Sequence, residues 1–290
     1  MTTKIQTRRY DISVLRVISM LLIILCHIIK NYTFVPFSEK LSEVFNAGVY
    51  TFLGISGYLF GMKHIERFKE WILARVKRIW LPVFLLVTVD IVFLKIISNV
   101  DISVRQAITY TLNLQGLMFL NWRWFSGLLG GEITNLGPLW FMTVIMLCYL
   151  FVPLLQFIKE RTKWCWVVVL IFSFVGFGLI DITTGFHGFY FAAFASGYFL
   201  SAYHSENKSL GFRKVIVISA AVLLMQIGRV LLQKTMDDST VYHIYIGYSH
   251  SALGLVLLLI MSCIRITSDC LPLETVGLCK CLMRIRFTFI

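Results

Sequence analysis

Arg16 and His27 are the residues whose types and spacing point most directly to chemistry. They lie eleven residues apart within the first long apolar run of the chain, residues 12–30. Eleven helical steps of about 100° return to nearly the same face, and the rise between the two residues is roughly 16 Å. Neutral imidazole can take a proton from a hydroxyl group, which is the task of a general base. The pair therefore predicts a polar stripe along one membrane helix that suits a buried reaction path.

A structural role is open for both side chains. His27 can hydrogen-bond a neighbouring helix, and Arg16 can extend its charged end to the membrane surface. A charge in hydrocarbon nevertheless costs several kcal/mol and rarely persists without a task. The placement of both residues on one face favours the functional interpretation.

The composition sets the class of protein that must position these residues. Of the 290 residues, 58% are hydrophobic and only 14% are charged, whereas a soluble domain carries about 25% charged residues. The net charge of +12 does not indicate a nucleic-acid-binding protein, because the basic residues lie in short connections between apolar runs. We therefore predict an all-α fold, a polytopic bundle of transmembrane helices.

Eight apolar runs have about the length of twenty residues that a bilayer requires. The predicted spans cover residues 12–30, 44–62, 79–98, 136–158, 164–181, 185–204, 215–233 and 245–264. The longest connection, residues 99–135, is expected to lie at the membrane surface or to dip inward. We expect one domain over residues 1–265 and a short cytoplasmic tail over residues 266–290.

The basic residues also predict the orientation in the membrane. With the N-terminus inside, 19 lysine and arginine residues fall in inside segments and five in outside connections. This asymmetry predicts that both termini lie in the cytoplasm. Arg16 then lies toward the cytoplasm and His27 in the outer half of the bilayer.

A basic segment precedes the third predicted span. Residues 63–78 carry six lysine and arginine residues, and we expect them to form a cytoplasmic loop. Arg75 and Arg78 are three residues apart and share a face if the chain is helical. With Lys77 they form a candidate site for a phosphorylated ligand, because guanidinium groups match phosphate oxygens. Positive-inside topology and contact with lipid headgroups are the alternatives.

Four further residues are candidates for substrate binding: Ser56, Trp140, Arg229 and His250. Ser56 lies between Gly54 and Gly57, which are typical of close helix packing, and it has no neighbouring base that would make it a nucleophile. A tryptophan at the start of a span is usually part of the aromatic belt. Arg229 and His250 lie toward the outer ends of the last two spans, where they face either an acceptor or the membrane surface.

The seven cysteines show no metal-binding or disulfide pattern. Those within apolar runs behave as small hydrophobic residues. Cys279 and Cys281 form a single Cys-x-Cys without partners. We therefore expect no metal ion.

Several of these motifs occur in an order that resembles the acyltransferase-3 family of bacterial integral-membrane acyltransferases. Arg16 and His27 are similar to the Arg-x10-His pair of its first span. The other matching segments are Phe52–Leu59 with its Ser-Gly pair, Arg75-x-x-Arg78 followed by Ile-Trp-Leu-Pro82, and Leu139-Trp140-Phe141 with Tyr149 and Pro153 downstream. The resemblance covers about residue 8 to residue 265.

The resemblance implies acyl transfer, commonly of acetyl, from cytoplasmic acyl-CoA to a hydroxyl group of an envelope glycan or glycolipid in the bacterial plasma membrane. His27 would then be the catalytic base or proton shuttle, and Arg16 would orient the acyl group or stabilise developing charge. Arg75 and Arg78 would bind the phosphates of CoA. The partners would be acyl-CoA, the glycan acceptor and the bilayer, with no nucleic acid.

The C-terminal segment departs from the pattern of the family. Members often end with a Ser-Tyr-x-x-Tyr-Leu-x-His segment and further spans. Here Leu273–Gly277 resembles the approach to that segment, and residues 278–290 then become basic and too short to span a membrane. We hypothesise a truncated or frameshifted gene, which would leave the catalytic residues present and the bundle incomplete.

Two other classes of protein fit the same pattern. Internal basic residues and eight spans would suit a transporter of lipid-linked glycans or small molecules, although no inverted repeat is visible. A non-catalytic or inactive membrane protein would agree with the unusual C-terminal segment. Only an enzyme should consume acyl-CoA and depend on His27.

Overall fold

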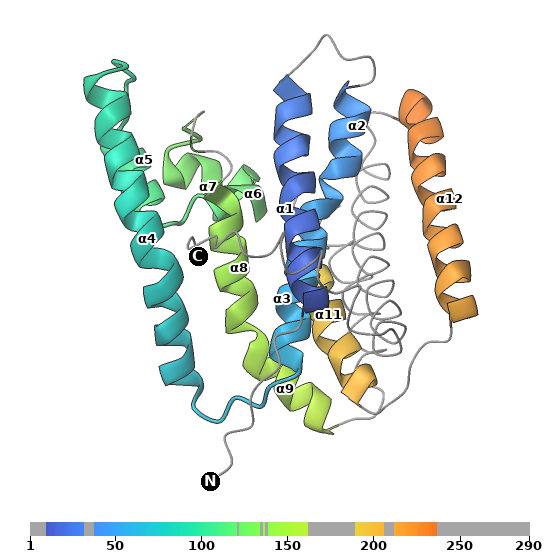
Figure 1. Ribbon diagram of the computed structural model, residues 1–290. Helices are drawn as coiled ribbons and strands as arrows, with labels where there is room; N and C mark the ends of the chain where they lie inside the picture. Colours follow the sequence, from blue (N-terminus) through green and yellow to red (C-terminus); the bar gives the residue numbers. More distant parts are fainter. Residues whose placement is uncertain are drawn as a thin grey trace, which may run out of the picture. The chain divides into compact units, whose positions relative to one another are not determined.

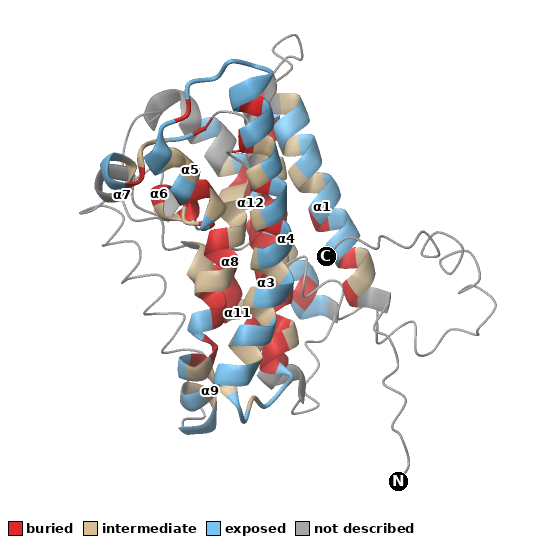
Figure 2. Ribbon diagram, turned by 90° about the vertical axis from the view of Figure 1, so that its left-hand side faces the viewer, coloured by how far each residue is buried: buried red, intermediate tan, exposed pale blue. Residues whose placement is uncertain are grey.

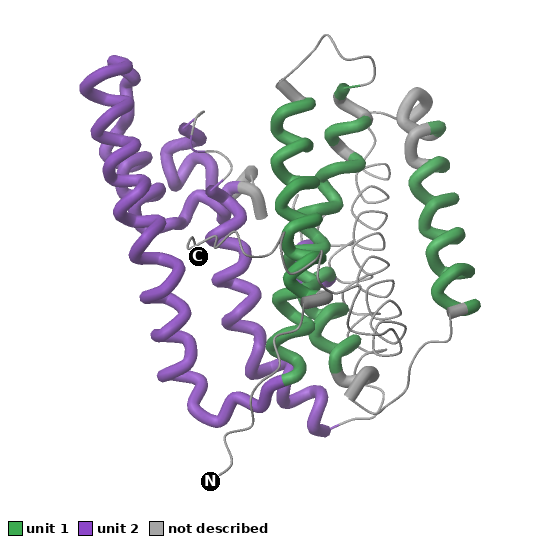
Figure 3. The backbone as a smooth tube through the Cα atoms, in the orientation of Figure 1, with its two compact units in different colours: residues 1–62, 193–286 green, residues 63–192, 287–290 purple. Residues whose placement is uncertain are grey.

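The computed structural model describes residues 10–31, 38–120, 122–133, 136, 139–161, 189–205 and 212–236, and their regular secondary structure is helical (Figure 1). Three apolar helical stretches in these ranges are long enough to cross a membrane: Ile12–Ile29, Phe68–Ile96 and Trp140–Arg161. The predicted all-α membrane bundle is thereby confirmed. The described chain forms two compact units, which comprise residues 1–62 with 193–286 and residues 63–192 with 287–290 (Figure 3).

Unit 1 is built around a short, buried helix that is rich in glycine. Its helices are α1 (Tyr10–Asn31), α2 (Ser38–Phe45), α3 (Ala47–Gly61), the part of α11 (Phe189–Ser205) from residue 193 onward, and α12 (Phe212–Met236). Nearly every residue of α3 is buried (Figure 2). Because glycine has no side chain, the backbones of neighbouring helices can approach α3 closely.

Two faces of α3 make these close approaches. A Cβ atom on Gly48 would lie 2.7 Å from the Ser19 carbonyl oxygen of α1. A Cβ on Gly57 would overlap the Phe194 carbonyl oxygen of α11, and one on Gly61 would overlap the Ser201 hydroxyl. The prediction that glycines in this span mark close helix packing is confirmed.

Unit 2 is built around one long helix that packs against a broken one. Its helices are α4 (Phe68–Ile96), α5 (Val104–Thr111), α6 (Gly116–Leu120), α7 (Trp122–Leu129), α8 (Trp140–Leu150) and α9 (Val152–Arg161). Helix α4 buries Val83, Val87, Ile91 and Leu94, whose spacing of three and four residues defines one face. Helices α5 to α7 gather at one end of α4 and α8 (Figure 1) and add Tyr110 to the same core.

The helices agree with the predicted spans in position but differ in their ends. The spans predicted at residues 12–30, 185–204 and 215–233 correspond to α1, α11 and α12. Those predicted at residues 164–181 and 245–264 lie outside the described residues, as does the predicted domain boundary at residue 265.

Two predicted spans are interrupted by turns. The span expected at 44–62 consists of the end of α2, a turn at Asn46, and α3. The span expected at 136–158 breaks at Phe151 between α8 and α9. Pro153 accounts for the second break, because proline has no N–H to donate to the preceding turn and fits best at the start of a helix.

The prediction of a loop over residues 63–78 is wrong for most of its length, because α4 already begins at Phe68. Residues 68–78 contain no glycine or proline and consist largely of good helix formers. The helix therefore continues beyond the apolar run that predicted its position. Pro82 lies inside α4, close to the point where the basic part gives way to the apolar part.

Candidate functional site

The α1 stripe comprises Arg16, Met20, Ile23 and His27. Helix α1 is unbroken from Tyr10 to Asn31, so the spacing of four, three and four residues keeps these side chains on one side. Arg16 and His27 are both exposed, whereas Ile23 is half-buried. The two candidate residues thus lie at the border of the packed face of α1.

The packed face of α1 fixes the position of the stripe within unit 1. Ile12 and Leu15 are buried against Ile55 and Tyr58 of α3. Ser19, which is fully buried, donates a hydrogen bond to the Leu15 carbonyl oxygen at 2.8 Å. A rotation of α1 would have to break the contacts of Ile12 and Leu15 with α3. The α1 stripe therefore has a defined orientation relative to α3.

Ser56 lies on the same unit as the α1 stripe, in the middle of α3. It is 6% exposed and lies next to Gly57, at which α3 meets α11. A buried hydroxyl beside a tight backbone contact is consistent with a structural role in helix packing. The location is also close in sequence to Ile55, which packs against α1.

The basic cluster, Arg75, Lys77 and Arg78, lies on the N-terminal third of α4 in unit 2. Arg75 and Arg78 share a face because they are three residues apart on a helix, whereas Lys77 is about 200° from Arg75. The Arg75 guanidinium lies 5.9 Å from the ring centre of Trp71, and Trp71 packs edge-on against Tyr149 of α8. Arg75 is half-buried, while Lys77 and Arg78 are exposed.

This arrangement fits a ligand that carries several phosphate groups. Two guanidinium groups on one face offer paired donors, and the contact with Trp71 restricts the movement of one of them. In the described part of the chain, no group of three or more His, Cys, Asp or Glu side chains is arranged to hold a metal ion.

Trp140, at the start of α8, belongs to an aromatic group in unit 2. Its ring centre lies 4.9 Å from that of Tyr190 and 6.1 Å from that of Phe141. The side chain is half-buried. One turn further along α8, Thr143 is part of a buried polar network that the sequence did not predict.

That network joins α8 to the turn between α5 and α6. The Thr143 hydroxyl donates to the Asn113 carbonyl at 2.7 Å and accepts from the Gly116 N–H at 3.0 Å. The fully buried Gln115 amide donates to Asn113 and to the Leu139 carbonyl, both at 3.0 Å. Asn113 has a φ of 57°, a left-handed conformation that asparagine tolerates better than most residues.

A second set of polar contacts holds the connection between α7 and α8. The Tyr110 hydroxyl accepts a hydrogen bond from the Ile133 N–H at 2.9 Å, and the Thr109 hydroxyl donates to the Leu129 carbonyl at 2.9 Å. Burial raises the pKa of the Tyr110 hydroxyl, and its hydrogen bond with Ile133 opposes part of that effect. The only sequence signal for these contacts was the occurrence of polar residues in the segment 99–135.

The last two candidates are only partly described. Arg229 lies on α12, but its side chain is outside the description. His250 is outside the described residues.

Comparison with known proteins gives the class of this chain. The sequence pattern of the family described as "Acyltransferase domain" matches residues 9–280. The chain therefore belongs to the acyltransferase-3 family of membrane acyltransferases. Neither the curated proteins nor the solved structures contain a match to it.

Proposed function

We propose that this protein is a membrane O-acyltransferase that moves an acyl group, in the simplest case acetyl, from acyl-CoA to a hydroxyl group of a bacterial cell-envelope polysaccharide or glycolipid. The observation that carries the proposal is the family match over residues 9–280. It is supported by Arg16 and His27, which lie on one side of an unbroken α1.

His27 would act as the general base. Its neutral imidazole would take the proton of the acceptor hydroxyl, and the resulting oxygen would attack the thioester carbonyl. The carbon–sulfur bond would then break, so that the products are the acyl ester and the thiol form of CoA, which regains the proton. Arg16, on the same side of α1, would orient the acyl group or stabilise the negative charge that develops on the carbonyl oxygen.

The basic cluster would bind the donor. CoA carries a diphosphate and a further phosphate, and Arg75 and Arg78 could pair with these groups while Lys77 adds a positive charge. Ser56, Trp140, Arg229 and His250 are proposed as substrate-binding residues. Orientation with both termini in the cytoplasm would place the basic cluster on the side where acyl-CoA is made.

The donor assignment predicts a specific kinetic change. Replacing both Arg75 and Arg78 with Gln should raise the KM for acetyl-CoA by about tenfold to a hundredfold. This range corresponds to a net loss of about 1.5–3 kcal/mol, the contribution of one hydrogen bond to a charged group. The reaction can be followed as release of the CoA thiol by the full chain in proteoliposomes that contain the glycan acceptor. Replacing Lys63 and Lys69 with Gln removes the same amount of charge from the same region and should leave the KM nearly unchanged. An unchanged KM in the arginine variant would remove this role.

A further inference from the structure

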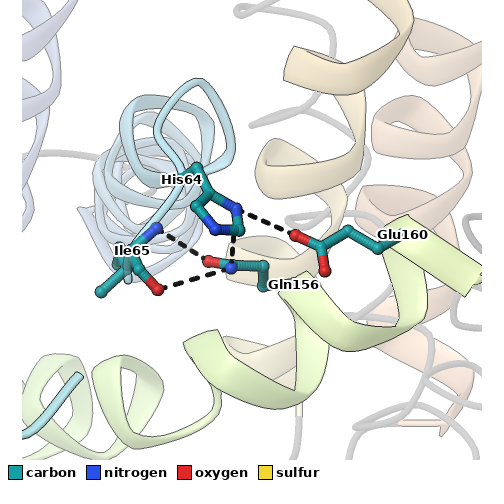
Figure 4. A network of polar contacts seen from close by, with 4 residues as sticks. All are labelled: His64, Ile65, Gln156 and Glu160. Carbon is teal, nitrogen blue, oxygen red and sulfur yellow. Dashed lines mark hydrogen bonds and ion pairs between the residues drawn. The ribbon is translucent and has the colours of Figure 1, made fainter. Parts of the chain in front are cut away.

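A polar network docks the connection between α3 and α4 onto α9 (Figure 4), and the residues of this network all belong to unit 2. The Ile65 N–H donates to the Gln156 Oε1 atom at 3.0 Å, and the Gln156 amide nitrogen donates to the Ile65 carbonyl at 3.4 Å. Next to this pair, the His64 Nδ1 atom lies 2.9 Å from the Gln156 amide nitrogen and 3.0 Å from a carboxylate oxygen of Glu160. Two different partners thus compete for one ring nitrogen.

The two contacts of His64 require opposite forms of that nitrogen. The Gln156 amide nitrogen can only donate, so its contact needs a lone pair on Nδ1. The Glu160 carboxylate can only accept, so its contact needs a hydrogen on Nδ1. Protonation of the imidazole places a hydrogen on both ring nitrogens and selects the contact with Glu160, while the Gln156 amide keeps the Ile65 carbonyl as its acceptor.

Several other charged side chains lie in the elements around His64. The charged residues of the connection, the start of α4 and the end of α9 are Lys63, Glu66, Arg67, Lys69, Glu70, Lys159, Glu160 and Arg161. Arg67 pairs with Glu70 at 3.1 Å, and the Arg161 guanidinium lies 4.8 Å from the ring centre of Phe157. Glu160 is the carboxylate in contact with the imidazole, and the two side chains are 61% and 52% exposed.

Aromatic contacts link this network to the basic cluster. A cavity of about 140 Å³ beside the network is lined by Ile65, Phe68 and Phe157, among others. The ring centre of Phe68 lies 5.6 Å from that of Trp71, and Trp71 lies under the Arg75 guanidinium. The start of α4 is therefore held at two points. Ile65, just before the helix, contacts α9, and Trp71, in its first turn, contacts α8.

We propose that His64, Gln156 and Glu160 form a proton-sensitive clamp that positions the N-terminal third of α4. Neutral His64 is divided between two tautomers, of which one contacts Gln156 and the other contacts Glu160. Protonation of His64 tightens the clamp, because it removes the tautomer that contacts Gln156 and converts the contact with Glu160 into an ion pair. These are positioning residues. Their effect on the donor rests on the proposed function, whereas their effect on α4 does not.

Hydrogen–deuterium exchange tests the clamp without any assay of activity. The full chain in lipid nanodiscs is compared at pH 6 and pH 8, across the range of about pH 5–8 in which histidine changes charge, with correction for the intrinsic exchange rate. Protection of the peptide that contains the Ile65 amide should be about twofold to fivefold greater at pH 6, the size expected for an exposed ion pair. His64→Gln and Glu160→Gln should abolish this difference, and Gln156→Ala should lower protection at both pH values. Glu66→Gln, which removes a nearby charge outside the clamp, should keep the difference.

Equal protection at the two pH values, or a pH difference that survives in His64→Gln, would overturn the clamp. The link to the donor is tested by measuring the KM for acetyl-CoA of the unchanged protein and of His64→Gln. The KM of the unchanged protein divided by that of His64→Gln should be lower at pH 6 than at pH 8. The corresponding ratio of the kcat values should be the same at both pH values. A KM ratio that does not change with pH would overturn the link. If no acyl transfer occurs in any variant, the proposed function fails, while the exchange measurement still decides the clamp.

Discussion

Unit 1 and unit 2 differ in the kind of contact that holds their helices together. In unit 1, α3 meets α1 and α11 through glycines, so that backbone lies against backbone at Gly48 and Gly57. In unit 2, α4 and α8 are separated by branched and aromatic side chains, and polar residues such as Thr143 connect them to the turns between them. Unit 2 also contains such a contact, because a Cβ on Gly116 would overlap the Trp140 carbonyl oxygen. We infer that the contacts of α3 in unit 1 are sensitive to added atoms, and that the turns of unit 2 are sensitive to the loss of hydrogen-bonding groups.

The largest effect is expected from Gly57→Ala in unit 1. The new methyl group would overlap the Phe194 carbonyl oxygen, so that α3 and α11 would have to separate. Overpacking costs about 1–3 kcal/mol and occasionally more, and a clash with backbone should lie at the upper end. The measurement is the midpoint of thermal unfolding in detergent.

Gly127→Ala in unit 2 is the matched control for this change. A Cβ atom at Gly127 has no other atom within 4 Å. Alanine is favoured over glycine in a helix by about 1 kcal/mol, so the control should be neutral or slightly stabilising. If both variants unfold at the same temperature as the unchanged protein, the contrast between the units is wrong.

A smaller effect is expected from Thr143→Val in unit 2. The change removes the acceptor of the Gly116 N–H and the donor to the Asn113 carbonyl, both of which are buried. An unsatisfied buried group costs about 1–3 kcal/mol, and we expect the free energy of unfolding of Thr143→Val to fall by about 2 kcal/mol. Thr88→Val on α4 removes only a bond to the Phe84 carbonyl within the same helix. Equal losses of stability in the two variants would contradict the importance of the network.

Tyr110→Phe should have the smallest effect, about 1 kcal/mol, because only the acceptor of the Ile133 N–H is lost. Burial raises the pKa of this hydroxyl, so folding favours its neutral form. The stability from the neutral form is complete below the ordinary tyrosine pKa of about 10 and is lost as the pH rises through the higher pKa of the folded state. The free energy of unfolding, measured from pH 8 to pH 11, should therefore depend less steeply on pH in Tyr110→Phe than in the unchanged protein. Identical profiles would show that the hydroxyl does not contribute.

The sequence was sufficient to predict those elements that depend on local patterns. The apolar run around Arg16 predicted α1, and its unbroken helix keeps Arg16 and His27 on one side. The glycines near Ser56 predicted the close approach that α3 makes with its neighbours. The start of α4 could not be predicted from hydropathy, because an apolar run indicates only the part of a helix that lies in the membrane. The residues before that run are good helix formers, and they extend α4 back to Phe68.

The polar networks could not be predicted because their partners are far apart in sequence. Gln156 contacts Ile65 across 91 residues, and Thr143 contacts Asn113 across 30. His64 lies within the basic segment of residues 63–78, and Gln156 lies within the span predicted at residues 136–158. The hydrogen bonds arise only once α9 lies beside the connection that precedes α4, and no single-sequence pattern contains that information.

The central claim is that this chain is an acyltransferase that depends on His27. Its most direct test measures ester-linked acyl groups on the envelope glycans of a bacterial host that lacks its own enzyme of this kind. The host would express either the unchanged chain or His27→Ala at equal levels in the membrane. We predict acylation by the unchanged chain and a loss of at least about a hundredfold in the variant, as expected for removal of a general base. Equal acylation by both proteins would contradict the role of His27, and no acylation by either would contradict the proposed activity of this chain.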